Sequence, residues 1–359
     1  MSFNPTYPHD LALLPPKIDL DSKKLTNLLI KAHSELGELK GYSFSMPNPL
    51  LLLSPAIIKE SLASSEIENI NTTLVNVLEN QLFPEAEQKK PDKEVLRYQD
   101  AVFTGFSALE KYSLSSRTIH DIQKALLPET PSSGYRKVQN GIKNAATGQI
   151  IYMPPIASKI PGLMGNLENF MNDKTDNIDP LIKCAMLHYQ FEAIHPFGDG
   201  NGRTGRILMV LQLVYTGILT YPILYISSYI NHNKKEYYRL LLEVTTNTNW
   251  EEYIAFMLNG FYLQAKETKD LLFKIMNFFF DLKKVLKTNH KKIYSADLVE
   301  VLCSYPVITP VKLANKLDIH YTTASRYLYE LLKNGILTEK KYGKYHLFAN
   351  KELLKIIHK

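Results

Sequence analysis

The chain has 359 residues and a formal net charge of +6, with 45% hydrophobic and 22% charged residues. This is the composition of a soluble protein that can bury a core in more than one domain. Its two cysteines, Cys184 and Cys303, have no paired His or Cys spacing, which excludes a disulfide framework and a zinc site and favours the cytoplasm.

Residues 1–20 carry several prolines and lack both a basic region and a continuous apolar run, so they are not a secretory signal. We expect an extended arm. A helical pattern of leucines then begins at Asp21 and ends near Gly41. The short apolar run 50–53, which follows two prolines, is expected to be an anchoring loop or a short helix.

Residues 58–69 have apolar and small side chains at helical spacing, which predicts a helix rather than a loop. Taken alone, Glu68 belongs to a solvated face of that helix. A charged, proline-flanked connection follows at 85–93, and amphipathic helices are expected at about 95–111 and 116–126.

A β-hairpin is expected next, because two β-prone runs, 135–138 and 149–153, flank a Gly/Asn turn at 144–148. Pro154 and Pro155 end the second run and expose its edge. An isolated hairpin is only marginally stable, so it must pack on another element.

Two buried helices follow the hairpin. Residues 182–194 are apolar on most of a helical surface, and Pro196 predicts that this helix stops at or near His195. Residues 207–219 form a second apolar run that is too short to span a bilayer. The segment between them is therefore a loop at a helix-loop-helix corner.

This loop contains a base and a carboxylate. His195 lies at the C-terminus of the first helix, where the helix dipole favours a proton arriving on the imidazole, so it is placed as a general base. Asp199 lies among positive groups and is best explained by a divalent cation that bridges it to phosphates.

The residues after Asp199 predict a phosphate site. Gly200 and Gly202 allow a tight turn, and the helix that begins beside them directs unpaired N–H groups toward a ligand. Arg203 and Arg206 are three residues apart on one helix face and suit phosphate oxygens.

Residues 200–205 also fit the dinucleotide pattern G-x-G-x-x-G, but a helix rather than a strand precedes them. No acidic residue occurs between Arg206 and Glu236, where that pattern requires one. No Gly-Lys-Ser/Thr follows, so the segment is not a P-loop.

Residues 195–206 match every fixed position of His-Pro-Phe-x-Asp-Gly-Asn-Gly-Arg-x-x-Arg, and the chain therefore resembles the Fic family (filamentation induced by cAMP). The resemblance implies transfer of AMP from Mg²⁺-bound ATP to a Ser, Thr or Tyr hydroxyl of a target protein. His195 would accept the hydroxyl proton and Asp199 would hold Mg²⁺. The residues that would bind ATP are Gly200, Asn201, Gly202, Arg203, Thr204, Gly205 and Arg206.

The resemblance gives a second meaning to the helix at 58–69. Ser64-x-x-x-Glu68-Asn69 is similar to the Fic inhibitory motif, Ser/Thr-x-x-x-Glu followed by Gly or Asn. Glu68 would then pair with Arg206 and deny it to the γ-phosphate, while Ser64 would help to hold the helix in place.

Two further features gain a role from the resemblance. The hairpin would be a flap that aligns a target segment by strand addition, with Ile151 and Tyr152 facing it. A structural hairpin without a ligand is left open. Tyr237 and Tyr238 resemble a pair that lines the adenine pocket, with Tyr237 the weaker candidate, and core packing is left open for both.

The C-terminal residues have a different character. Residues 309–348 predict a helix-turn-helix followed by a β-wing. Residues 291–359 hold 12 basic and 6 acidic side chains, so they carry the whole net charge of the chain. DNA contact and protein docking are both left open. The groups expected to face DNA are Thr322, Thr323, Ser325 and Arg326 on the second helix and Lys340, Lys341 and Lys344 on the wing.

We therefore expect a mainly α-helical protein with a Fic-type core, a hairpin flap and a winged helix-turn-helix. The expected divisions are an N-terminal region with the inhibitory motif (1–95), a catalytic domain (96–284) and the winged domain (285–359). Removal of AMP, phosphoryl transfer and a nucleotide-sensing DNA-binding regulator are the alternatives to adenylyl transfer. A homodimer is left open, and no membrane contact is expected.

Overall fold

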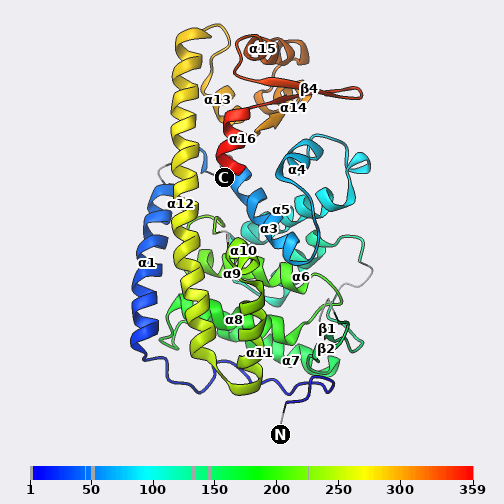
Figure 1. Cartoon of the computed structure of the whole chain (residues 1–359), viewed down its shortest axis with the longest axis vertical. Helices are drawn as coiled ribbons and strands as arrows, with labels where there is room; N and C mark the ends of the chain where they lie inside the picture. The colour runs from blue at the N-terminus through cyan, green and yellow to red at the C-terminus, as the bar shows by residue number, and fades with distance from the viewer. Residues whose placement is uncertain are drawn as a thin grey trace. The chain divides into compact units, whose positions relative to one another are not determined.

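The computed structural model describes residues 3–44, 46–49, 53–130, 134–143, 147–224 and 226–358. These residues form a mainly helical structure with two small antiparallel sheets, as predicted (Figure 1). The chain divides into two compact units, each built from separated segments. Unit 1 contains Met1–Lys40 and Arg97–Lys266, and unit 2 contains Gly41–Leu96 and Glu267–Lys359. The predicted boundaries at residues 95 and 284 stay predictions.

Unit 1 is a helical assembly around α8 (Pro180–Ile194), which is buried over almost its whole length. Helices α7 and α9 pack against it. The other elements are α6 (Ser116–Leu126), η2 (Ala157–Lys159), α7 (Ile160–Asn172), α9 (Asn201–Tyr215), α10 (Ile226–His232) and α11 (Lys234–Asn247), with parts of α1 (Lys23–Phe44), α5 (Lys90–Leu109) and α12 (Trp250–Asn289).

The ends of α8 are set by specific residues. Asp179 caps its first turn by accepting a hydrogen bond from the Leu181 N–H at 2.8 Å, and Pro180 fits the first helical position. The Nε2 atom of His33 in α1 forms a hydrogen bond of 2.8 Å with the other carboxylate oxygen of Asp179. At the other end His195 adopts a left-handed conformation with φ 49°, so the predicted stop before Pro196 is confirmed.

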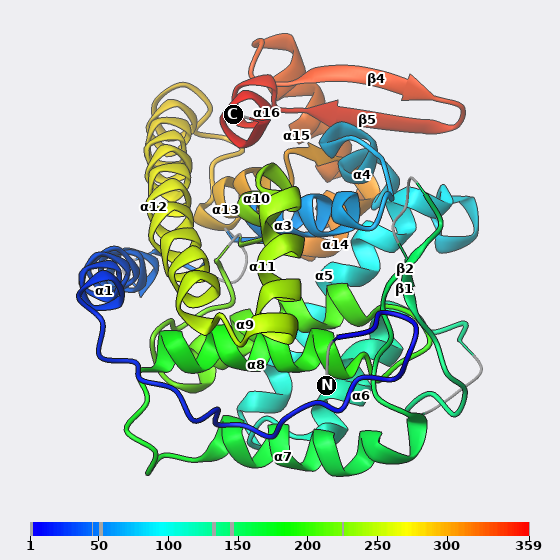
Figure 2. The same ribbon diagram turned by 60° about the horizontal axis from the view of Figure 1, so that its bottom comes forward.

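The N-terminal arm is extended, as expected, with no helix or strand among residues 3–22. Figure 2 shows it crossing α7 and α8 toward the hairpin. Asn166 of α7 exchanges two hydrogen bonds of 2.9 Å with the main chain of Leu14, and the Gln190 side chain donates to the Ala12 oxygen at 2.8 Å. The His9 N–H donates to the Met153 oxygen at 2.9 Å, next to the hairpin.

The predicted hairpin is confirmed, but the predicted place of its first strand is wrong. The strands are β1 (Ile142–Lys143) and β2 (Ile150–Tyr152), with Ile142 opposite Tyr152. Residues 135–138 form bends instead, because the Arg136 side chain is buried and bonds to surrounding main chain rather than pointing out from a strand. Most of the predicted turn, residues 144–146, lies outside the described residues.

Unit 2 combines an early helical segment with the C-terminal module. Helix α3 packs against α4 and α16, and a three-stranded antiparallel sheet has the order β3-β5-β4. Residues 50–52 of the predicted anchoring segment lie outside the described residues. The elements are α3 (Ser54–Ile67), α4 (Leu74–Asn80), η1 (Glu85–Glu87), α13 (Ala296–Ser304), β3 (Val307–Ile308), α14 (Pro310–Leu317), α15 (Tyr321–Lys333), β4 (Thr338–Tyr342), β5 (Tyr345–Ala349) and α16 (Lys351–His358).

The C-terminal elements occur in the predicted order of helix, turn, helix and hairpin. Thr309 caps α14 by accepting from the Lys312 N–H at 3.2 Å, and Pro310 opens the helix. Asp318 turns the chain in a left-handed conformation, and Gly335 does so after α15. Over the described part of the chain, no helix combines the length and the apolar character that crossing a bilayer requires.

Candidate functional site

The loop between α8 and α9 is held in shape by Asn201. Its side chain donates to the Phe197 oxygen at 2.8 Å and accepts from the Phe197 N–H at 2.8 Å, which closes the loop on itself. Gly200 has φ 80°, and an added Cβ would lie 2.9 Å from the Leu127 side chain. The left-handed conformation favours glycine at this position, and a larger residue would also require the Leu127 side chain to shift.

Helix α9 begins at this loop and presents an anion-binding end. Gly200 is its N-cap and supplies no side-chain hydrogen bond to the first turn. The N–H groups at the start of such a helix are positioned to bind phosphate. Arg203 and Arg206 follow on the same helix, both with buried side chains, and add two guanidinium charges.

Asp199 is placed differently from these buried arginines. Its side chain is 73% exposed, its Oδ1 accepts from the Gly200 N–H at 2.6 Å, and Arg203 Nη2 lies 3.9 Å away. Within the described residues no cluster of three or more acidic, His or Cys side chains could form a metal cage. An exposed single carboxylate fits Mg²⁺ that takes its remaining ligands from phosphates and water.

Arg136 fixes the main chain of the loop at residues 195 and 196, a role that no sequence pattern predicts. Its Nε–H donates to the His195 oxygen at 3.0 Å, and its own N–H donates to the Pro196 oxygen at 2.8 Å. Its guanidinium also donates to the oxygens of Pro155, at 2.5 Å, and Val138, at 3.1 Å. The side chain is 6% exposed, so Arg136 links the loop to the segment beside β2 from within the core.

A cavity lies between the hairpin, α8 and α11. The hairpin contributes Ile151 and Tyr152, α8 contributes Glu192, and α11 contributes Tyr238. Glu192 also borders α9, because a Cβ added to Gly205 would lie 2.5 Å from its Oε1. The remaining lining residues are Ile142, Tyr189, Ala193, Leu241, Leu242 and Thr245.

The structure separates the two adjacent tyrosines. Tyr238 is 40% exposed and lines the cavity, whereas Tyr237 is 2% exposed and bonds through its hydroxyl to His188 Nε2 at 2.8 Å. Burial, with the nearby Arg206 charge, lowers the pKa of His188 to about 3. The imidazole is therefore neutral, and in this conformation the Tyr237 side chain belongs to the core.

Tyr152 anchors the hairpin rather than pointing freely outward. Its hydroxyl donates to the Ala193 oxygen at 3.0 Å in the last turn of α8, and its ring lies 5.8 Å from that of His9. Desolvation raises the pKa of Tyr152 well above its usual value. Ile151 is half-buried and lines the cavity. The hairpin thus packs on α8, as its marginal stability requires.

Three family models match the chain. The Fic/DOC family model matches residues 113–213, the Fic/DOC family N-terminal model matches residues 26–107, and the model for the C-terminal domain of SoFic-like protein adenylyltransferase matches residues 279–353. Together they span most of the sequence, and the first includes the whole loop at 195–206.

The chain belongs to the Fic/DOC family.

Two curated Fic relatives match parts of this Fic protein. It is 36% identical over 93 residues to the protein adenylyltransferase Fic of Aedes aegypti, across 26% of this chain and 18% of the relative. It is 27% identical over 171 residues to that of Drosophila grimshawi, across 46% and 33%. This chain therefore matches a third or less of these relatives' lengths.

Solved structures show the same fold at low identity. A Fic family protein from Desulfovibrio desulfuricans G20 is 19% identical with a TM-score of 0.58, over 94% of this chain and 98% of that one. Fic-1 from C. elegans is 18% identical with a TM-score of 0.52, over 68% and 72%. The first match covers almost the whole of this Fic protein.

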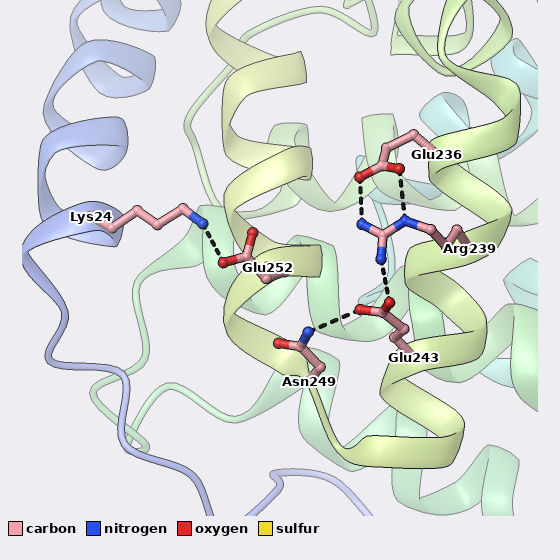
Figure 3. Close-up of polar contacts among 6 residues, drawn as sticks. All are labelled: Lys24, Glu236, Arg239, Glu243, Asn249 and Glu252. Carbon is pink, nitrogen blue, oxygen red and sulfur yellow. Dashed lines mark hydrogen bonds and ion pairs between the residues drawn. The ribbon is translucent and has the colours of Figure 1, made fainter.

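Helix α11, which carries Tyr238, also carries a group of paired charged side chains (Figure 3). Arg239 forms a two-bond ion pair with Glu236, at 2.6 and 2.8 Å, and a second ion pair with Glu243. Asn249, just before α12, donates to Glu243 at 2.9 Å. Both ion pairs lie within α11 and are exposed to water and salt, so they support its helical conformation only weakly, whereas the Asn249 bond ties the end of α11 to the start of α12 in this Fic protein.

The predicted inhibitory motif lies at the end of α3. Glu68 is the exposed C-cap of this helix, and Ser64 is fully buried one turn earlier. Asn69 follows with φ 62°, while the Asn69 and Ile70 N–H groups donate to the Glu66 and Ser65 oxygens at 3.0 Å. This is the Schellman ending, which favours Gly or Asn at the left-handed position. It explains why Asn suits the position after the glutamate.

Glu68 and Arg206 belong to different compact units, so their pairing stays a prediction. The predicted DNA-facing groups lie within unit 2. On α15, Thr322 and Arg326 are exposed, whereas Thr323 and Ser325 are half-buried. Lys340, Lys341 and Lys344 are exposed on the β4–β5 hairpin.

Proposed function

We propose that this Fic protein is a protein adenylyltransferase that transfers AMP from ATP to a Ser, Thr or Tyr hydroxyl of a target protein. One juxtaposition supports this function. Glu192 lines the apolar cavity and also lies against Gly205, about one turn after the anion-binding start of α9, which suits a ligand with an aromatic base at one end and phosphates at the other. The names of the relatives support the same reaction.

In this proposal the adenine base enters the cavity against Tyr238 and Ile151, and the phosphates bind at the start of α9. The N–H groups around Gly200, Asn201 and Gly202 bind phosphate oxygens, and Arg203 and Arg206 add charge. Asn201 acts chiefly by shaping the loop, because its side chain is bonded to Phe197. Gly205 acts through the close approach of α9 to α8, and buried Thr204 supports the same turn.

The reaction is a displacement at the α-phosphorus. The target hydroxyl oxygen forms the new bond to phosphorus, its proton passes to His195, and the bond from phosphorus to the departing pyrophosphate breaks. Arg203 and Arg206 neutralise the charge that develops on pyrophosphate. Asp199, with phosphate oxygens, would hold Mg²⁺, which supplies further charge neutralisation when bound.

Strand addition supplies the target geometry in this proposal. In this proposal β2 pairs with the target main chain, Tyr152 fixes the strand to α8, and Ile151 lines the cavity proposed for the nucleotide.

We place the reaction in the cytoplasm, which suits two buried free thiols, Cys184 and Cys303.

His195→Ala tests the proposed reaction directly. The variant should lose transfer of label from ATP labelled at the α-phosphate while binding ATP with nearly unchanged affinity, because the imidazole moves a proton and does not hold phosphate. Mass spectrometry of the modified target distinguishes added AMP from added phosphate or from AMP removal. Transfer by the alanine variant at the wild-type rate would show that His195 is not the base.

We further propose that Glu68 inhibits the enzyme by pairing with Arg206, with Ser64 holding α3 in place. A carboxylate on that guanidinium competes with the γ-phosphate for the same donors. Glu68→Gly should raise labelling about tenfold or more, a coupling of the size usual between linked sites. Arg206→Ala should lower labelling, and the double variant should resemble Arg206→Ala. An unchanged rate in Glu68→Gly would remove Glu68 from the inhibitory role and leave the catalytic assignments intact.

A further inference from the structure

The β4–β5 hairpin is held within unit 2 by residues 79–87, which we call the clasp segment. Lys340 Nζ lies 2.7 Å from both carboxylate oxygens of Glu79. Lys344 Nζ lies 3.4 Å from Glu87, whose other oxygen accepts from the Tyr345 hydroxyl at 3.0 Å. Two of the three exposed lysines of this hairpin, Lys340 and Lys344, are thus already paired with carboxylates.

An aromatic contact lies between the two ion pairs. The ring of Phe83 stacks on Tyr342 with centroids 5.4 Å apart and approaches Tyr345 at 4.8 Å. Phe83 is 9% exposed, so its side chain is buried by the hairpin and its surroundings. The clasp segment therefore combines two carboxylates with a buried ring, and it complements the hairpin in both charge and shape.

The charged part of this contact is open to solvent on its lysine side. Lys340 and Lys344 are 57% and 72% exposed, and Glu87 is 46% exposed, so water and salt screen the Lys344–Glu87 pair. Glu79 is 13% exposed, so its pair with Lys340 is screened less. Phosphates of duplex DNA present the same kind of anionic oxygen at high density, and lysines bind them with release of counterions. A duplex and the clasp segment would compete for the same two ammonium groups.

Duplex DNA is the polyanion that the rest of the module favours. Tyr321, Thr322 and Arg326 are exposed on α15, the second helix of the helix-turn-helix, where base-reading and phosphate-binding groups are placed in such motifs. Residues 291–359 also carry the net positive charge of the chain. The α15 face remains accessible while the clasp segment occupies the hairpin.

The clasp segment is connected directly to the proposed inhibitory helix. Helix α4, whose last turn carries Glu79, begins at Leu74, only a short link after Glu68, and it packs against α3. Thr73 caps α4 by accepting from the Asn76 N–H at 3.2 Å, and Thr72 bonds to Asp92. Moving the clasp segment away from the hairpin would therefore alter the packing at the end of α3 that presents Glu68.

We propose that the clasp segment is an internal substitute for the DNA phosphate backbone, so that binding of duplex DNA to the hairpin and seating of α4 exclude one another. DNA binding then loosens α3 and raises adenylyl transfer. Because coupling between two events is reciprocal, weakening the clasp also strengthens DNA binding. The competition stands on unit 2 alone, whereas the effect on transfer rests on the proposed function.

The competition is tested by fluorescence anisotropy with the full chain and a labelled random-sequence duplex at low salt. Glu79→Gln with Glu87→Gln should bind about three- to tenfold more tightly than wild type, because the duplex no longer displaces two carboxylates. Lys340→Gln with Lys344→Gln should bind more weakly than wild type. The matched control is Asp297→Asn with Glu352→Gln, which removes the same charge from exposed positions on α13 and α16 of unit 2.

For the proposal to hold, the clasp variant (Glu79→Gln with Glu87→Gln) must bind duplex DNA more tightly than the control variant (Asp297→Asn with Glu352→Gln). If the control binds as tightly as the clasp variant, the gain comes from net charge and the competition is refuted. Absence of duplex binding by wild type and by the clasp variant at low salt also refutes it, and assigns the module to another partner.

Hydrogen exchange provides a second measurement that requires no enzymatic activity. Saturating duplex should speed amide exchange in residues 74–87 of the wild-type protein, and exchange that is unchanged on binding would refute the competition. Duplex DNA should also raise the transfer of labelled AMP by wild type. It should not raise transfer by Glu68→Gly, because that variant already lacks the proposed inhibitory carboxylate. If DNA binds and exchange rises while no variant transfers label, the proposed function fails and the competition stands.

Discussion

The buried guanidinium of Arg136 donates from Nε to the main-chain oxygen of His195 at 3.0 Å, which joins residues 59 positions apart in sequence. The same side chain reaches Pro155, just beyond β2. Arg136 thus holds the main chain at His195, the proposed general base. It also holds the main chain just after β2, the strand proposed to bind the target.

Replacing Arg136 should therefore affect activity as well as stability. Arg136→Lys keeps the charge but cannot make all of the main-chain bonds, so buried carbonyls lose partners at a cost of about 1–3 kcal/mol. We expect a lower thermal midpoint and a lower kcat with little change in the KM for ATP. Arg117→Lys, at an exposed position on α6, is the control and should change neither. A stability loss without a kcat change would leave Arg136 with a purely structural role.

The adjacent tyrosines should respond in opposite ways. Tyr238→Ala removes an aromatic wall of the cavity, worth about 1 kcal/mol, and should raise the KM for ATP about fivefold with little effect on stability. Tyr237→Phe removes the hydroxyl that bonds to buried His188 and should lower the thermal midpoint while leaving the KM nearly unchanged. If the KM for ATP rose in Tyr237→Phe and not in Tyr238→Ala, the adenine of ATP would have to lie on the Tyr237 side of α11.

Asn69 offers a way to weaken the end of α3 without changing Glu68. Asn69→Val places a branched side chain in a left-handed conformation at a cost of about 1–2 kcal/mol and should raise labelling, whereas Asn69→Gly should retain inhibition. Asn177→Val is the matched control, because Asn177 is also left-handed with φ 53° but lies in unit 1. Equal labelling by the two valine variants would mean that strain in general, not the end of α3, controls activity.

His33 should make stability depend on pH. Its hydrogen bond and charge interaction with Asp179 raise the pKa of His33 above the usual 6.5. The raised folded-state pKa means that the stabilisation is complete below pH 6.5 and is lost as the pH rises through the folded-state value. The difference in thermal midpoint between wild type and His33→Gln should accordingly shrink above pH 6.5. In an Asp179→Asn background, which retains an N-cap, the difference in thermal midpoint that His33→Gln causes should no longer depend on pH. In the wild-type background, a difference that stays constant with pH would show that the His33–Asp179 ion pair does not cause the pH dependence.

The structural features that were predicted correctly from the sequence are those set by neighbouring residues along the chain. Pro196 ends α8 at His195, Thr309 and Pro310 start α14, and the proline-rich start of the chain forms an extended arm, all as expected. These features depend on a few adjacent residues. The separation of Tyr237 from Tyr238 also follows from helical geometry, although only the structure shows which of the two faces the cavity.

The features that sequence reasoning missed depend on long-range contacts. A β-prone run around Arg136 became bends because its side chain found main-chain acceptors near His195 and Pro155. The lysines of the β4–β5 hairpin were predicted to face DNA, but two of them are paired with Glu79 and Glu87, more than 250 residues earlier. Neither propensity nor periodicity encodes such partners, because each lies in a different segment of the chain.

The order of synthesis has a consequence for unit 2, which is assembled from the segments Gly41–Leu96 and Glu267–Lys359. Helix α3 leaves the ribosome early, but α16, which packs against it, is made last. At usual translation rates, all of unit 1 is synthesised on the order of ten seconds before the chain is complete. In a newborn molecule the whole of unit 1, which holds the proposed active site, would therefore be synthesised before α3, the proposed inhibitory helix, has its full set of packing partners. Chains that stop prematurely after unit 1 would never acquire those partners.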